Sequence, residues 1–410
     1  MACAIGCDVG SQSLKGVLIA SDGKQLAQAS RSYSMHFPRP GWAEQDPEAW
    51  FSALRVVIPE LLEKAGVRAG EVGTLGLASQ VDGVVAVDAE GCALHPAITW
   101  MDRRAEEQCS ALERRIERRA VLDLTGLNLD SSHAAAKMLW LRDEAPGVFT
   151  RTKALLLPGS YLVRRLTGEC IVDHSNASST MLYDVRQRCW SPTMINASGL
   201  DPCLLGRIAA AGDLAGQLLP SAAEELGLAP GAGVIVGCGD EHAACLGAGV
   251  LAPGRICDIA GTAEPVATLA ATPRIDETGL VETHGHADPR WWLIENPGFV
   301  SGGSLTWLAG MLGWTSFDPA FAAASQAPPA SEGLIFLPCL SGAMTPTWNG
   351  KARGVFFGLS MKHASGHLAR AVIESSAYAL RDILDRFVAL GLGGDEVYVT
   401  GGGSKSELWC

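Results

Sequence analysis

The most constraining feature of this sequence is a strand-and-loop unit that occurs twice, far apart in the chain. The first copy is Asp8-Val-Gly-Ser-Gln-Ser-Leu-Lys15, and the second is Asp258-Ile-Ala-Gly-Thr262. Each places an acid and small or hydroxyl-bearing residues next to a short β-type run. Backbone N–H groups in such turns can hold phosphate, and the acid can hold Mg²⁺ or accept a proton. The repeat predicts two related halves that face one nucleotide, and hence a phosphotransferase.

The first loop offers Gly10, whose missing Cβ lets the backbone approach a phosphate closely. The predicted nucleotide-binding residues of this loop are Asp8, Gly10, Ser11, Gln12, Ser13 and Lys15. An ordinary Gly/Ser hairpin is the alternative, because short glycine loops are common. The chain has no Walker A pattern and no Gly-x-Gly-x-x-Gly that opens a helix, which disfavours P-loop and dinucleotide-binding folds.

A third segment, Gly237-Cys-Gly-Asp240-Glu, supplies the predicted general base. Asp240 follows an apolar strand at 233–236 and precedes an alanine-rich helix, a position from which a carboxylate can face a cleft. Such a base accepts the proton of a sugar hydroxyl as it attacks a γ-phosphate. A helix N-cap is the alternative, and the two roles are compatible. Asp8 and Asp240 are also the predicted ligands of Mg²⁺.

Polar residues at two further strand ends predict a site for a polyhydroxylated ligand. Carboxylates accept hydrogen bonds from hydroxyls, and aromatic faces cover the C–H patches of a sugar. For Asp102 the alternative is an N-cap of a helix predicted from Arg103. The predicted substrate-binding residues are Gln80, Val81, Asp82, Trp100, Asp102 and Asp240.

The composition limits the class of protein. A chain of 410 residues with 48% hydrophobic and 19% charged residues is typical of an ordered protein of two or three domains. The net charge of −12, without a basic run, argues against a nucleic-acid partner. Twelve scattered cysteines and an N-terminus that runs straight into a strand pattern predict free thiols and a cytoplasmic location. No run of about 18 apolar residues is present, so no membrane span is expected.

Strand and helix patterns alternate in both halves, which predicts an α/β fold. The domain boundary is predicted between 250 and 251, before the turn residues of 251–254. Strands are predicted at 4–9, 15–20, 25–30, 72–78, 84–91, 154–157, 233–237, 255–260, 282–286, 291–295 and 396–400. Helices are predicted at 47–65, 103–122, 134–142, 240–250, 302–312 and 367–390.

Taken in order, the motifs resemble the FGGY carbohydrate kinase family of the actin-like ATPase superfamily, and most of all its xylulokinase-like members. Beside the phosphate loops, the resemblance rests on Gly41-Trp-Ala-Glu-Gln-Asp-Pro-Glu-Ala-Trp50 and Lys137-Met-Leu-Trp-Leu-Arg-Asp-Glu144. Ala134 departs from the first family signature, which has Pro, Ser or Thr there. The second signature fits throughout 354–374, and 401–406 resembles the adenosine motif.

The resemblance implies two ribonuclease-H-like domains around a cleft, with sugar bound mainly by 1–250 and ATP mainly by 251–410. It implies phosphorylation of a sugar or polyol by ATP with Mg²⁺, with Asp240 as base and Asp8 near the metal. A homodimer is one expected assembly. The second set of implied nucleotide-binding residues is Gly261, Thr262, Gly302, Gly401, Gly402 and Gly403.

Two departures from the family pattern affect the expected function. Gln80-Val-Asp82-Gly stands where xylulokinase-like relatives carry Gln-Met-His-Gly, which puts xylulose itself in question. The chain stops soon after Gly403, so the second domain is expected to be truncated, with only a short helix at 404–410 and with Leu408 and Trp409 exposed. The alternatives are therefore an inactive sugar-binding or regulatory remnant and a generic actin-like ATPase. The sugar-side segments argue against the generic ATPase.

Overall fold

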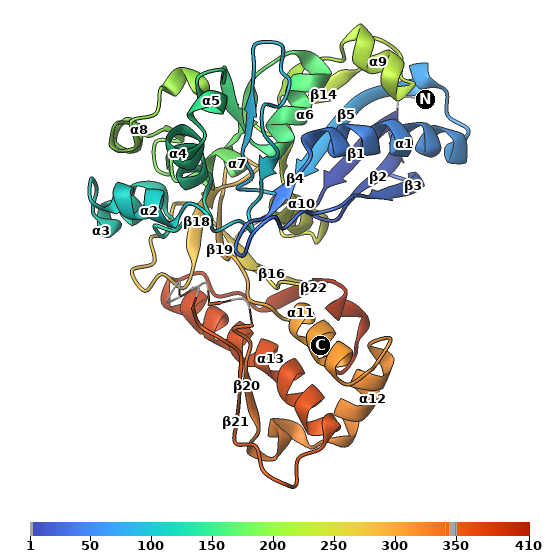
Figure 1. Ribbon diagram of the computed structural model, residues 1–410. Coiled ribbons are helices and arrows are strands. Elements are labelled where there is room, and N and C mark those ends of the chain that lie inside the picture. The colour runs from blue at the N-terminus through green and yellow to red at the C-terminus, as the bar shows by residue number, and fades with distance from the viewer. Residues whose placement is uncertain (1–2, 341, 344–348, 350) are drawn as a thin grey trace. The chain divides into compact units, whose positions relative to one another are not determined.

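The computed structural model describes residues 3–340, 342–343, 349 and 351–410 (Figure 1). The chain divides into two compact units. The first comprises Met1–Ala243 and His284–Arg290, and the second comprises Ala244–Thr283 and Trp291–Cys410. The second unit is thus interrupted by a short segment that returns to the first, a feature that the predicted single boundary did not include.

The first unit is built on a mixed sheet whose strands follow the order β13-β14-β5-β1-β2-β3, with β15 also paired to β5. Neighbours β1, β2 and β3 are antiparallel, whereas β1, β14 and β15 all run parallel to β5. The predicted opening meander is confirmed. The strands are β1 Cys3–Val9, β2 Ser13–Ala20, β3 Gln25–Ser32, β5 Val72–Ser79, β13 Leu214–Gln217, β14 Gly233–Ile235 and β15 Cys238–Gly239.

Helix α1 (Pro47–Ala65) covers this sheet (Figure 1). The Asp46 side chain accepts a hydrogen bond from the Glu48 N–H, and Gly66 ends the helix in the left-handed region at φ 63°. The apolar stripe of α1 is fully buried against the strands, because its spacing keeps these side chains on one face. The stripe consists of Trp50, Phe51, Leu54, Val57, Ile58 and Leu61.

The rest of the first unit consists of short elements around α4 and α6. The helices are α2 Glu106–Glu113, α3 Arg118–Thr125, α4 Ala134–Glu144, α5 Pro146–Phe149, α6 Pro158–Thr167, α7 His174–Ser178, α8 Pro192–Ser198 and α9 Pro220–Leu226. Helix α10 (Asp240–Gly247) begins in the first unit and ends in the second. The short strands are β4 Glu44–Gln45, β6 Val85–Val87, β7 Ala97–Ile98, β8 Ala154–Leu156, β9 Ile171–Asp173, β10 Tyr183–Asp184, β11 Cys189–Trp190 and β12 Arg207–Ala209.

The single helix predicted over 103–122 was wrong. The structure has two helices there, and α2 begins at Glu106 rather than at Arg103. Between α2 and α3 the chain turns, and Arg118 folds back onto Glu113 with an Nε–Oε1 distance of 2.5 Å. These residues are five apart, a spacing that does not place two side chains next to each other on one continuous helix.

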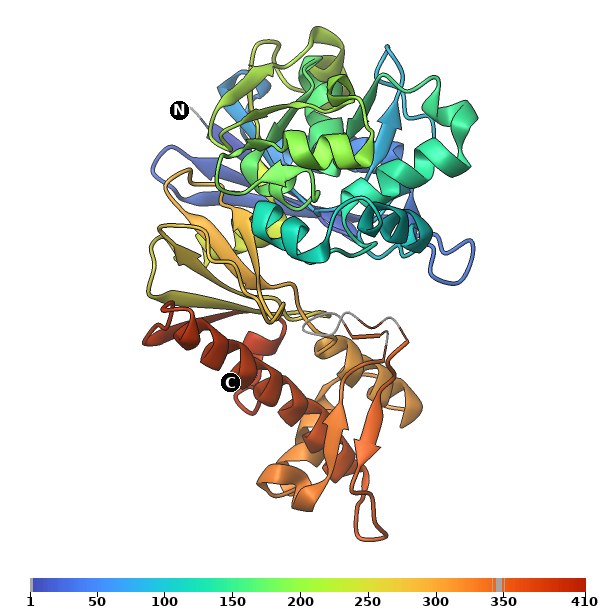
Figure 2. The same ribbon diagram turned by 90° about the vertical axis from the view of Figure 1, so that its left-hand side faces the viewer.

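The second unit has a five-stranded sheet in the order β18-β19-β17-β16-β22, with helices packed beside it (Figure 2). Strand β16 pairs in parallel with β22 and antiparallel with β17. The strands are β16 Arg255–Ala260, β17 Val266–Ala270, β18 Glu282–Gly285, β19 Trp292–Asn296, β20 Ile335–Leu337, β21 Val355–Phe357 and β22 Glu396–Gly401. The last two residues of β18 belong to the segment that is grouped with the first unit. The helices are α11 Gly302–Met311, α12 Asp318–Gln326 and α13 Ser365–Ala389.

The last residues differ from the expected short helix. Only Gly403–Lys405 forms a helical turn, of the 3-10 type. Leu408 and Trp409 are partly buried against the apolar cluster of this unit, so their predicted exposure was wrong. The Trp409 ring meets the Phe321 ring edge to face at 6.4 Å between centroids, and this packing replaces the helix as the anchor of the segment.

The helices and the cysteines bear on two further questions, namely membrane spans and disulfide bonds. The longest helix, α13, carries charged residues along its length, including Arg370 and Glu374. In the described parts of the chain, no helix combines the length and apolar character needed to span a bilayer. All twelve cysteines are thiols, and none forms a disulfide within the described residues.

Candidate active site

Two acids lie at the carboxyl ends of two strands of the first unit that flank β5 and run parallel to it. Asp8 in β1 and Cys238 in β15 are both register partners of Ala78 in β5. Asp240 follows two residues after Cys238, at the start of α10. Ligands of such sheets bind at this edge. The structure therefore brings together two of the predicted site residues that are far apart in sequence.

Two glycines turn the chain between β14 and Asp240. Gly237 has φ 84°, and a Cβ on it would overlap the Leu77 carbonyl oxygen. A Cβ on Gly239 would lie 2.9 Å from Val81 Cγ1. The Gly239 N–H donates to Ser175 Oγ at 2.8 Å. Both positions require glycine because the backbone passes directly against its neighbours. This packing fixes the position of Asp240 and gives Val81 a packing role beside it.

Asp240 is half-buried, and its Oδ1 accepts a hydrogen bond from the Glu241 N–H at 3.0 Å. Burial, followed by the charges of Glu241 and Asp8, holds the pKa of Asp240 well above its usual range. A carboxylate whose pKa lies closer to neutrality is a better general base, because its conjugate acid is weaker. The geometry and the raised pKa suit the predicted role.

One carboxylate oxygen of Asp8 lies near a lysine, and the other has no hydrogen-bond partner. Lys15 Nζ lies 3.9 Å from Asp8 Oδ2, across the β1–β2 register. Asp8 Oδ1 is buried and has no hydrogen-bond partner. Burial raises the pKa of Asp8, and the Lys15 charge opposes this shift. An unsatisfied buried oxygen of this kind is suited to a cation or to a water molecule.

The first loop is held by side chains from three other segments. The Tyr33 hydroxyl donates to the Gly10 carbonyl oxygen at 2.5 Å, and Trp100 Nε1 donates to Ser11 Oγ at 2.8 Å. Gln45 Nε2 donates to the Ser11 carbonyl oxygen at 2.6 Å.

Trp100, predicted for the sugar, thus contacts the phosphate-type loop. The sequence interpretation missed Tyr33 and Gln45, although Gln45 lies inside the family-like segment at 41–50. The side chains of Gln12 and Lys15 are exposed, and that of Ser13 is half-buried.

Gln80 is a buried residue with one free acceptor. Its N–H donates to the Val9 carbonyl oxygen at 3.0 Å, and its Nε2 donates to Gln45 Oε1 at 2.8 Å. Gln80 Oε1 is buried without a hydrogen-bond partner. A substrate hydroxyl could donate to this oxygen, which supports the prediction for Gln80.

Asp82 is already engaged with the start of α4. Its backbone adopts φ 57°, and its Oδ1 accepts from the Ala134 N–H at 3.0 Å. His133 Nδ1 lies 3.1 Å from Asp82 Oδ2, and Lys137 Nζ donates to the Asp82 carbonyl oxygen at 2.8 Å. Asp82 thus caps α4 from outside the helix. Its contact with a sugar stays a prediction.

Asp102 is fully buried and also has protein partners at both oxygens. Its Oδ2 accepts from the Ala43 N–H at 2.6 Å, and Arg104 pairs with both oxygens. The Arg104 guanidinium stacks 3.7 Å from the Trp42 ring centroid. These contacts join the 41–50 segment to the start of the α2 region. The predicted sugar contact of Asp102 remains untested beside this structural role.

In the second unit, the second loop is packed by backbone contacts. The Gly302 N–H donates to the Gly261 carbonyl oxygen at 3.2 Å, and the Gly303 N–H donates to the Thr262 carbonyl oxygen at 3.0 Å. A Cβ on Gly302 would overlap the Gly261 carbonyl oxygen. The first turn of α11 therefore rests directly on the loop, and only glycine allows this approach.

The glycines at 401–403 lie beside that loop. Gly401, with φ 80°, is the register partner of Ala260 at the end of β16. A Cβ on Gly403 would lie 2.6 Å from the Ala260 Cβ, whereas one on Gly402 would meet nothing closer than 4.0 Å. Because β16 and β22 are parallel, both predicted nucleotide segments of this unit leave the sheet at the same edge.

A second acid accompanies the second loop and was not predicted. Asp258 and Glu264 are 2% and 1% exposed, and their carboxyl groups hydrogen-bond to each other. Burial raises the pKa of Asp258 to about 6, and burial together with the charge of Asp258 raises that of Glu264 to about 8. The sequence did offer a signal for this acid, because Glu264 stands directly after the Gly261-Thr262-Ala263 turn.

The acids of the first unit fit a magnesium site of the type found in phosphotransferases. Within the described residues, no group of three His, Cys, Asp or Glu side chains is arranged to hold a metal. Mg²⁺ in such enzymes is bound by one or two carboxylates, with water and phosphate oxygens as its other ligands. The unpartnered Oδ1 of Asp8 matches that donor set. Asp240 lies close enough that the charge of Asp8 raises its pKa.

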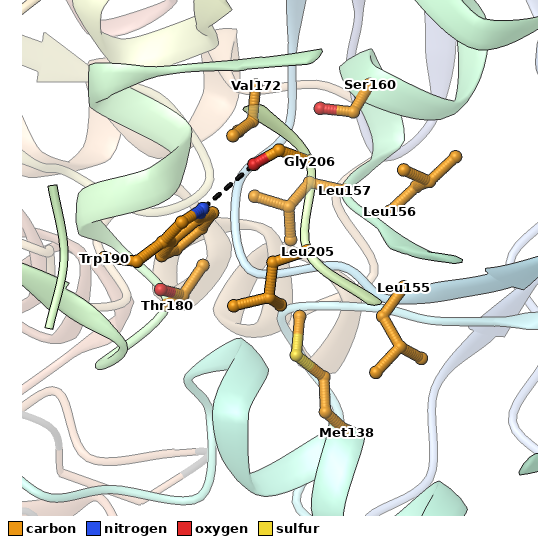
Figure 3. A pocket seen from close by; sticks show the side chains of 10 residues that line it. All are labelled: Met138, Leu155, Leu156, Leu157, Ser160, Val172, Thr180, Trp190, Leu205 and Gly206. Atoms are coloured by element: carbon orange, nitrogen blue, oxygen red, sulfur yellow. Dashed lines mark hydrogen bonds between the residues drawn. The ribbon is translucent and has the colours of Figure 1, made fainter. Parts of the chain in front are cut away.

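A small apolar pocket elsewhere in the first unit contains none of the predicted site residues (Figure 3). Trp190 Nε1 donates to the Gly206 carbonyl oxygen across it at 2.9 Å. The pocket lies among core side chains and offers few polar groups, so it does not suit a sugar or a nucleotide. Its lining residues are Met138, Leu155, Leu156, Leu157, Ser160, Val172, Thr180, Trp190, Leu205 and Gly206.

The chain matches two family models in order. Residues 3–247 match the N-terminal domain of the FGGY family of carbohydrate kinases, and residues 259–410 match the C-terminal domain of the same family. The comparisons with known proteins do not support an inactive remnant. The chain spans 83% of the length of the two xylulose kinases of Escherichia coli and Klebsiella pneumoniae.

Individual relatives agree with the family models. The chain is 34% identical to a xylulose kinase of Escherichia coli (strain K12), over 99% of this chain and 83% of that protein. It is 30% identical to a glycerol kinase of Aromatoleum aromaticum, over 100% of this chain and 84% of that protein. A ligand-bound xylulose kinase structure from Lactobacillus acidophilus superposes with a TM-score of 0.91 at 26% identity, over 100% of this chain and 83% of that one. This chain therefore belongs to the FGGY family of carbohydrate kinases, and it is an enzyme of that class.

Proposed function

We propose that this enzyme transfers the γ-phosphate of ATP to a hydroxyl of a ketopentose or a related polyol. The substrate class is supported by the similar proteins, several of which are named xylulose kinase. The observation that carries the chemistry is the placement of Asp8 and Asp240 at the carboxyl ends of two strands that flank β5 and run parallel to it, beside a loop of phosphate-binding type.

In the proposed reaction, the Asp240 carboxylate accepts the proton of the substrate hydroxyl as that oxygen attacks phosphorus. Gln80 Oε1 orients the substrate by accepting a second hydroxyl proton. Backbone N–H groups of the Gly10–Ser13 and Gly261-Thr262 turns hold the phosphates, and Gly401, Gly402 and Gly403 approach the adenosine. Mg²⁺, when bound by Asp8 and Asp240, supplies charge neutralisation at the phosphate oxygens.

We assign sugar binding mainly to residues 1–250 and ATP binding mainly to residues 251–410. A cytoplasmic location is proposed from the free thiols, which suit a reducing compartment. A homodimer stays a prediction.

The test is ADP release by the purified enzyme, measured over a panel of ketopentoses, polyols and deoxysugars. One ketopentose or polyol should stimulate ADP release, and the same substrate should leave the Asp240→Asn variant nearly inactive. Equal hydrolysis with and without sugar would instead identify a generic ATPase. Tight sugar binding by calorimetry without any turnover would identify a binding protein.

A further inference from the structure

The acid pair Asp258–Glu264 lies at the base of the second phosphate loop. Asp258 is in β16, and Glu264 follows the loop directly before β17. Both carboxyl groups are buried, and they hydrogen-bond to each other. Asp258 Oδ1 and Glu264 Oε2 have no hydrogen-bond partner. Two carboxylate oxygens can approach in this way only if a proton lies between them, because two ionised groups would repel.

The strand neighbours of Asp258 are apolar. Val266 of β17 and Val399 of β22 are the register partners of Asp258. The Ser301 side chain, directly before α11, acts on Glu264 by lowering its pKa. The Cys257 thiol is the other titratable neighbour, and the charge of Asp258 acts on it. Within the described chain, no Lys, Arg or His forms an ion pair with either acid, so no cation replaces the proton.

The pair is connected to the loop through several backbone contacts. The Gly261 N–H donates to the carbonyl oxygens of Ile259 at 2.8 Å and Ala263 at 3.1 Å, which makes the turn tight. The Glu264 N–H donates to the Phe299 carbonyl oxygen at 3.0 Å. The Ser301 hydroxyl, which also acts on the pKa of Glu264, donates to the Gly261 carbonyl oxygen at 3.3 Å. A change in the pair therefore reaches the loop from both of its ends.

We propose that Asp258 and Glu264 share one proton and act together as positioning residues for the Gly261-Thr262 phosphate loop. The shared proton ties the two ends of the loop together and leaves one negative charge behind it. At alkaline pH the proton is lost, and two repelling carboxylates spread the base of the loop. The added charge also opposes the anionic phosphates of the nucleotide. This role rests on the proposed function, because the loop is taken to bind ATP.

The first experiment measures KM for ATP and kcat from neutral to alkaline pH. In the wild type, KM for ATP should rise by about fivefold as the proton is lost, which corresponds to one hydrogen bond, while kcat at saturating ATP changes little. Glu264→Gln keeps a donor and cannot ionise, so its KM should stay constant. Asp258→Asn is the second variant, with the same expectation. Glu396→Gln, an exposed acid of the same sheet, should follow the wild type.

The second experiment does not require turnover. Infrared difference spectroscopy of the nucleotide-free enzyme should show the carbonyl band of a protonated carboxylic acid at neutral pH, absent in Glu264→Gln. If the wild type lacks this band, or if Mg²⁺ alone abolishes it, proton sharing is overturned. If the band is present but ATP affinity by calorimetry does not change with pH, the positioning role is overturned. If no sugar stimulates turnover, the proposed function fails while both measurements still decide this inference.

Discussion

The two phosphate-type loops begin from similar sequences but are held in different ways. The first loop is fixed by side chains of Tyr33, Gln45 and Trp100, and its acid Asp8 retains an open oxygen. The second loop is fixed by backbone contact with Gly302, and its acid is enclosed with Glu264. Similar motifs thus serve different ends: the first leaves a carboxylate available for chemistry, whereas the second uses its carboxylate for structure.

The largest effect should follow from Asp240→Asn, beside the first loop. The amide keeps the shape but cannot accept the proton, so kcat should fall by about 10²-fold or more, with sugar affinity changed far less. Asp258→Asn is the matched control in the second loop and should keep kcat. Steady-state kinetics on both variants test the comparison. A near-normal kcat for Asp240→Asn would remove Asp240 from the role.

The pH dependence of kcat/KM in the wild type tests the same role of Asp240. Because the pKa of Asp240 is raised, its ionised form is lost at a higher pH than for an ordinary aspartate. As pH falls, kcat/KM should therefore decline at a pH well above the usual carboxylate range. A profile that stays flat down to that usual range would contradict the raised pKa.

The next largest effect should come from Gly302→Ala. The added methyl group has no space against the Gly261 carbonyl oxygen, and overpacking of this kind costs about 1–3 kcal/mol. KM for ATP should rise by about tenfold or more. Gly310→Ala in the same helix is the control, because nothing lies within 4 Å of its Cβ, and this variant should be slightly more stable. Equal KM values in the two variants would show that the loop tolerates displacement.

A smaller effect is expected from Asp82→Ala. Loss of one partner for a buried polar group costs about 1–3 kcal/mol, so KM for the sugar should rise or the order of preferred sugars should change. Asp22→Ala, in the exposed β2–β3 turn, is the control. Should thermal stability fall while the substrate ranking and KM stay as in the wild type, Asp82 would serve only as the cap of α4.

Tyr33→Phe should have the smallest effect. It removes one hydrogen bond to Gly10, worth about 1 kcal/mol, and so loosens only the first loop. KM for ATP should rise a few-fold, with kcat nearly unchanged. A larger loss of kcat than of ATP affinity would mean that the Tyr33 hydroxyl acts on the chemistry rather than on the loop.

Much of the fold could be predicted because its signals are local. Strand β16 occupies the predicted range, and α1 begins at the predicted Pro47. The parallel arrangement that joins Asp8 to Asp240 also follows from placing both acids at strand ends. Hydrophobic periodicity and turn residues carry this kind of information.

The partners of individual side chains could not be predicted, because they depend on long-range packing. Asp82 meets His133, which lies 51 positions away in the sequence. Asp102 meets Ala43 from 59 positions away, and no local pattern indicates that its oxygens are already used. Glu264 was overlooked for the same reason: its meaning depends on the burial that it shares with Asp258. Sequence patterns locate elements, whereas tertiary contacts decide which polar groups remain available.

The return of residues 284–290 to the first unit has a consequence for any attempt to divide the protein. The Gly285 N–H donates to Ser178 Oγ at 2.9 Å, and the His286 ring lies 5.5 Å from that of His242. A cut after Ala243 would leave one fragment without a piece of its own interior and the other carrying that piece as an unmatched hairpin segment. We therefore expect neither fragment to fold by itself. When the two fragments are co-expressed, they should instead associate into the complete fold. Residues 284–290 of the second fragment would then pack into the interior of the first.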